Sequence, residues 1–107
     1  MITKKDLIRN ANCNAHARRY FFKVRGNYKE TEFYLEHYHQ IYQLNSASKG
    51  KTESEILELR SQMKSRFEDM KKQAETEFHN YPKGKYKTAL NYFLENYIGL
   101  TVFLMDA

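Results

Sequence analysis

A cysteine and a histidine three residues apart, Cys13 and His16, are the pair in this sequence whose types could do chemistry. On a helix that spacing puts a thiolate and an imidazole on one side, as half of a zinc site or as a nucleophile with its base. A structural zinc ion needs four ligands, and the other histidines offer no second pair at a suitable spacing. No third group can be assigned to orient a nucleophile. A buried cysteine and a hydrogen-bonded histidine at a helix start are the simpler interpretation, so we assign neither a metal site nor a catalytic residue.

Four basic side chains follow His16 closely, at Arg18, Arg19, Lys23 and Arg25. Residues 1–25 hold seven lysines and arginines and one aspartate, so the excess behind the net charge of +5 is N-terminal. Guanidinium groups pair their donors with phosphate oxygens, and a local basic surface attracts polyanions such as nucleic acid. The alternative is a solvated helix face. The local charge favours contact, and we predict that these four residues bind DNA.

Two further patterns are better explained by structure than by function. Lys83, Lys85 and Lys87 surround Gly84, but a phosphate-binding loop needs another glycine upstream and Ser or Thr directly after the lysine, so the pattern predicts a charged turn that caps a helix. The tyrosines of residues 31–44 could stack on bases, but at helical spacing core packing is favoured. No pair of carboxylates is placed as a general acid and base.

The elements that must position these residues are predicted to be helices. With 4 glycines and 1 proline in 107 residues, the chain has too few turn residues for an all-β sandwich or barrel. Hydrophobic residues make up 41%, enough for one core, so residues 1–107 are expected to form a single domain. We predict an all-α fold.

About four helices are expected, over residues 14–24, 31–44, 52–81 and from the turn at 82–84 to 104. Asn12 or Asn14 is the expected N-cap of the first, and residues 7–11 before it are expected to be a strand remnant or a loop. Thr52 and Glu55 form a capping box that starts a third helix of about 27 residues. This helix and the fourth, which has a coiled-coil-like apolar seam, should form a long antiparallel hairpin as the main element. The last turns are apolar nearly all round, which predicts burial in a core or against a surface outside this chain.

The sequence also indicates a compartment. One cysteine permits no internal disulfide, and no N-terminal stretch has the apolar run of a signal peptide. The longest apolar stretch, over residues 98–105, is far shorter than the roughly 20 residues that span a bilayer. We therefore expect a cytoplasmic protein that makes no contact with a membrane.

Two blocks of the sequence resemble bacterial transposases of the insertion sequence 66 family. The first, NCNAHARRYFF over residues 12–22, has a cysteine, two residues, a histidine, paired basic residues and an aromatic pair. The second, over residues 81–106, has a small basic turn, then Ala-Leu-x-Tyr, then Leu-Thr-x-Phe-Leu before the acidic Asp106. The blocks occur in the family's order with a helical spacer between them, so the resemblance spans nearly the whole chain.

The resemblance implies an Asp-Asp-Glu enzyme with an RNase H-like core, in which carboxylates hold divalent metal ions such as magnesium. In the family the two aspartates precede the first block and the glutamate follows the second, so no catalytic residue and no cofactor is carried over to this chain. Cys13 and His16 match the motif, and Arg18 and Arg19 match the basic pair, with an architectural or DNA-contacting role. Asn14 stands where the family commonly has tryptophan.

We therefore expect a non-catalytic helical fragment of a DNA transposase, covering the region between the second catalytic aspartate and the glutamate. Its expected partners are DNA, the missing portions of the transposase, and a second copy in a homo-oligomer. A stand-alone helical module for protein interaction or dimerisation is the alternative. A small thiol or metal enzyme built on Cys13 and His16 comes third.

Overall fold

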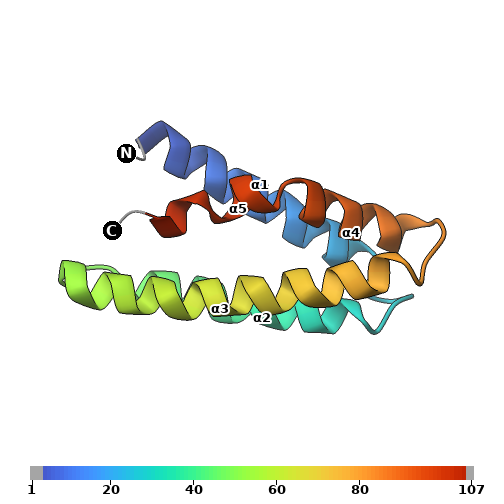
Figure 1. The fold of residues 1–107 in the computed structure, drawn as a ribbon, viewed down its shortest axis with the longest axis horizontal. Coiled ribbons are helices and arrows are strands. Elements are labelled where there is room, and N and C mark those ends of the chain that lie inside the picture. The colour runs from blue at the N-terminus through green and yellow to red at the C-terminus, as the bar shows by residue number, and fades with distance from the viewer. Residues whose placement is uncertain (1–3, 106–107) are drawn as a thin grey trace.

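The computed structural model describes the backbone of residues 4–105 and the side chains of residues 13–104. Within this range the backbone forms helices and no strand, as predicted. The elements are α1 (Lys4–Lys23), α2 (Thr31–Ala47), α3 (Glu53–Phe78), α4 (Lys85–Glu95), α5 (Tyr97–Thr101) and the 3₁₀ helix η1 (Val102–Met105). Successive long helices run in opposite directions, so the predicted antiparallel hairpin of α3 and α4 is one part of an up-and-down bundle (Figure 1).

Aromatic rings fill the space between the helices. Phe21 of α1 stacks on Tyr34 of α2 with ring centroids 4.2 Å apart, and its edge meets Phe93 of α4 at 6.3 Å. Tyr38 of α2 meets Phe67 of α3 edge to face at 6.0 Å. Because α1 packs on both α2 and α4, and α3 does the same, the four long helices close into a ring around one core.

The start of α3 agrees with the sequence pattern. Thr52 Oγ1 accepts from the Glu55 backbone N–H at 3.2 Å, and a Glu55 carboxylate oxygen accepts from the Thr52 N–H at 3.4 Å, so the predicted capping box is confirmed. The helix is 26 residues long and ends at Phe78, before the bend at Pro82. Gly84, at φ +115°, begins α4, and the Lys87 ammonium lies 4.2 Å from the Phe78 ring centroid, as expected for a charged turn.

The start of α1 was predicted wrongly. The helix begins at Lys4, so residues 7–11 are helical rather than strand or loop, and Asn14 lies inside α1 rather than at its N-cap. Helix α1 packs along α5 and η1, and this tertiary contact outweighs the weak local pattern. The first turn of α1 and η1 therefore lie at the same end of the bundle (Figure 1).

The C-terminal segment is interrupted, where the sequence predicted one continuous helix. Asn96 separates α4 from α5 at φ −102° and ψ 8°, and its side-chain amide donates back to the Tyr92 carbonyl at 2.8 Å. The seam residues Leu90, Phe93 and Leu100 are nonetheless buried. Ile98 is 82% exposed, so the apolar last turns are only partly covered by the described residues.

Candidate nucleic-acid interface

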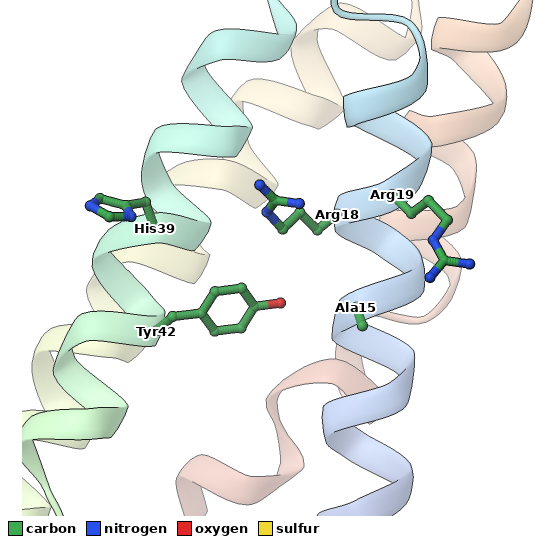
Figure 2. A pocket seen from close by; sticks show the side chains of 5 residues that line it. All are labelled: Ala15, Arg18, Arg19, His39 and Tyr42. Atoms are coloured by element: carbon green, nitrogen blue, oxygen red, sulfur yellow. The ribbon is translucent and has the colours of Figure 1, made fainter.

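A groove of about 380 Å³ lies between α1 and α2. We call it the basic groove, and its lining residues are Ala15, Arg18, Arg19, His39 and Tyr42. Figure 2 shows Arg18 reaching from α1 towards α2, and Tyr42 reaching back from α2 towards α1. Arg19 and His39 lie at the outer edges of the groove. No acidic side chain is among these lining residues.

The helical repeat of α1 explains why its cations face outward. Ala17, Phe21 and Val24 are buried at 4% exposure or less, and they fix the inner side of the helix. Arg19 and Lys23 then fall on the opposite side and are exposed, while Arg18 is half-buried at the boundary with α2. The buried pattern of α1 therefore presents its paired arginines to solvent and to the groove.

A second, smaller hollow of about 200 Å³ continues the basic surface along α1. It is lined by His16, Arg19, Tyr20 and Lys23, so Arg19 borders both hollows. Arg19 therefore connects the basic groove, which Arg18 lines, to the hollow that His16 and Lys23 line. Four of the six predicted site residues line these two hollows.

Tyr42 reports the electrostatics of the basic groove. Burial raises the pKa of its hydroxyl, and the neighbouring Arg18 charge acts in the opposite direction by stabilising the phenolate. The Arg18 charge therefore favours a negatively charged group at this end of the groove.

Arg25 has a structural partner that the sequence did not indicate. Its guanidinium lies 3.6 Å from the centroid of the Phe22 ring and donates to the Phe22 carbonyl at 2.8 Å. That carbonyl belongs to the last turn of α1, where a cation is favourable. Arg25 therefore closes the C-terminal end of the helix.

Cys13 and His16 have different surroundings. Cys13 is half-buried against the core, beside Tyr92, whose pKa is raised by burial and then by the Cys13 and Tyr20 neighbours. His16 is exposed and belongs to the hollow with Arg19. Cys13 therefore takes part in packing, and His16 in the basic surface.

The described residues do not fit the divalent metal that the resemblance implies. Within this part of the chain no three cysteine, histidine, aspartate or glutamate side chains converge as a metal site would require. We therefore assign the ion no ligand here and derive no step through it.

Asn14 is the structural residue that the sequence reasoning missed. It is buried, its amide donates to the Leu100 carbonyl at 3.0 Å, and its side-chain oxygen accepts from the Tyr38 hydroxyl at 2.9 Å. Leu100 lies near the end of α5, where the helix tightens into η1 and carbonyls lose their α-helical partners. Asn14 thus ties α1 to both α2 and α5.

His39 and Tyr42 were the missed members of the groove. The signal was present in the second helix, where Tyr34 and Tyr38 are buried but Tyr42, one turn further, is 40% exposed. The spacing of the tyrosines alone could not show where the buried stripe ends, because that depends on how α1 packs against α2.

Comparison with models of known protein families identifies the family of this chain. The family model described as "Transposase IS66 family" matches residues 1–107. No curated protein and no solved structure matches the chain. Across the described residues, no helix has both the length and the apolar character needed to cross a bilayer.

Proposed function

Because the chain belongs to the IS66 family of transposases, we propose that residues 1–107 act as one helical unit that contacts DNA during transposition. The contact is made by the basic groove and the adjoining face of α1. The observation that carries the proposal is the acid-free lining of the groove, with Arg18 and Arg19 on it. In this proposal the unit supplies no catalytic carboxylate.

The two arginines suit a nucleic-acid backbone. They are adjacent in the chain but diverge in space, Arg18 towards α2 and Arg19 away from it (Figure 2). Two guanidinium groups so placed can engage two different phosphates, and each contact releases counterions from the DNA. The resulting binding is independent of sequence and sensitive to salt.

The same proposal gives a role to α5. Ile98 is 82% exposed, and the neighbouring Leu94 and Val102 are half-buried. In the proposed assembly this apolar surface packs on the catalytic portion of the transposase.

A gel-shift titration of the 107-residue chain with a labelled duplex tests the DNA contact. Binding at low salt that weakens steeply as salt rises supports it, and no shift at low salt contradicts it. A cleavage assay with magnesium tests the non-catalytic part, because strand cleavage by the purified chain would overturn it.

A stand-alone interaction module is the second candidate, and the exposed Ile98 and Leu57 favour it. Analytical ultracentrifugation separates the two candidates. A stable dimer without affinity for DNA supports the interaction module, whereas a monomer that binds DNA supports the transposase unit.

A further inference from the structure

Exposed aromatic rings gather on the same side of the bundle as the cations. Among the described residues, the exposed large apolar side chains are Tyr20, Phe22, Tyr42, Leu57 and Ile98. The three aromatic members, between 38% and 40% exposed, all belong to α1 and α2, and the other two are aliphatic and lie on α3 and α5. Singly scattered apolar residues are normal on a protein surface, but rings that accompany a basic face need an explanation.

Each of these rings lies beside a positive charge. Tyr42 shares the basic groove with Arg18, and Tyr20 shares the second hollow with Arg19 and Lys23. The Phe22 ring lies 5.4 Å from the Arg18 guanidinium carbon and 3.6 Å from that of Arg25. Each of these rings therefore has a cation close to it, and a phosphate held by that cation would bring a base near the ring.

The rings of Tyr20 and Tyr42 pack against other rings of the bundle but remain partly exposed to solvent. Tyr20 packs on Tyr92 with centroids 4.9 Å apart, and Tyr42 lies 5.8 Å from Tyr38. Both nevertheless keep more than a third of their surface open to solvent. In contrast, Tyr34 and Tyr38, which lie on α2 like Tyr42, are fully buried. The open rings are thus available to a ligand without rearrangement of the core.

We propose that this face binds unpaired nucleotides of DNA, with bases stacked on Tyr42 and Tyr20 and phosphates held by Arg18 and Arg19. The inference rests on the proposed DNA contact and specifies the form of DNA that is bound. Stacking on an aromatic side chain is tolerant of sequence, because every base has a flat face.

The geometry favours a single strand over an intact duplex. In a duplex the bases are stacked on one another, and a protein ring reaches a base face only if that base leaves the helix. The rings would then face sugar and phosphate and contribute little. A flexible single strand can lie in the basic groove, place a base beside Tyr42 and continue towards Tyr20, because Arg19 borders both hollows.

Fluorescence anisotropy tests the inference with a labelled 20-nucleotide strand of low self-complementarity, compared with the same strand annealed to its complement. The single strand is expected to bind at least threefold more tightly than the duplex. Equal or tighter binding of the duplex overturns the inference and leaves the proposed function standing. Absence of binding to both probes overturns the proposed function as well.

Tyr42→Leu keeps an apolar side chain and removes the stacking face. Because stacking contributes substantially for each base, this variant is expected to bind the single strand roughly fivefold to a hundredfold more weakly, with less than a twofold change for the duplex. Tyr97→Leu is the matched control, because Tyr97 also lines a hollow and has a lysine, Lys71, 5.1 Å from its ring centroid. The inference is overturned if Tyr42→Leu loses the same affinity for the duplex as for the single strand. It is also overturned if Tyr97→Leu loses as much affinity for the single strand as Tyr42→Leu does.

A readout on the unaltered chain covers the case in which Tyr42→Leu fails to fold. A strand that carries 2-aminopurine changes its fluorescence when that base stacks on a ring. Quenching on binding, beyond that seen with the duplex probe, supports the inference. Tight binding without such quenching contradicts it.

Discussion

The basic groove and a second groove, lined by α3 and by Tyr97 of α5, differ in the balance of their charges. The second, which we call the mixed groove, has about 510 Å³ and is therefore the larger. Its lining residues are Lys64, Ser65, Glu68, Asp69, Lys71, Lys72, Glu75 and Tyr97. It has three lysines against the two arginines of the basic groove, but it also has three carboxylates. The lysines of the mixed groove are therefore balanced by carboxylates, whereas the lining of the basic groove contains no carboxylate.

A tyrosine in each groove reports this difference. Burial raises the pKa of both Tyr42 and Tyr97. In the basic groove Arg18 opposes that rise, whereas in the mixed groove Glu68 and Glu75 add to it. The same side chain therefore experiences charge of opposite sign at the two places.

The largest expected effect comes from removing both arginines of the basic groove. Arg18→Ala with Arg19→Ala should weaken DNA binding by roughly tenfold to a hundredfold and reduce the salt dependence of log Kd by about two, because two phosphate contacts are lost. Lys64→Ala with Lys71→Ala in the mixed groove removes the same charge and should change Kd less than about twofold. Equal losses in the two double variants, measured by anisotropy, would abolish the distinction between the grooves.

The next effect concerns the side chain that holds the walls of the basic groove together. Asn14→Ala should lower the free energy of unfolding by roughly 1 to 2 kcal/mol, because the Tyr38 hydroxyl and the Leu100 carbonyl lose a buried partner. Urea titration followed by circular dichroism measures it. Asn91→Ala, at an exposed site on α4, is the matched control and should stay within about 0.5 kcal/mol of the parent. If Asn91→Ala lowers the free energy of unfolding as much as Asn14→Ala does, Asn14 does not have this stabilising role.

A smaller effect on DNA affinity is expected when two carboxylates of the mixed groove are neutralised, which makes its charge more like that of the basic groove. Glu68→Gln with Glu75→Gln leaves its lysines largely uncompensated and should strengthen duplex binding about twofold to fivefold at low salt. Glu53→Gln with Glu58→Gln gives the chain the same net charge away from both grooves, and so serves as the control. If the control gains as much affinity, total charge rather than the groove explains the gain.

The smallest expected effect is a change in the pKa values of Tyr42 and Tyr97. Arg18→Ala should raise the pKa of Tyr42 further, because the phenolate loses a stabilising positive charge, whereas Glu68→Gln with Glu75→Gln should lower the pKa of Tyr97 towards its ordinary value. An NMR titration of the tyrosine ring carbons at alkaline pH follows both. Shifts in the same direction for the two tyrosines would contradict the opposite signs of charge.

The sequence predicted the features that depend on neighbouring residues. The capping box at Thr52 is a local interaction between residues three apart, so the residue types and their spacing were enough to predict it. The scarcity of glycine and proline excluded an all-β fold, and the helical spacing of apolar residues predicted the all-α class.

Features that depend on contacts between residues distant in the chain could not be predicted from the sequence. Asn14 looked like a helix cap, because nothing local shows that Tyr38 and Leu100 approach it. His39 and Tyr42 joined the candidate site only when α2 was placed beside α1. The break at Asn96 was hidden because the apolar seam continues through it, and Leu100 is still buried.

The first turn of α1 and η1 lie at the same end of the bundle, and this has a consequence for protein architecture. A bundle that the chain enters and leaves at the same end can be inserted into a surface loop of another domain while both keep their own cores. The turn at Gly84 lies at the opposite end of the bundle (Figure 1) and would then point away from the host domain. In such an arrangement the basic groove, between α1 and α2, would stay outside the junction between the two domains.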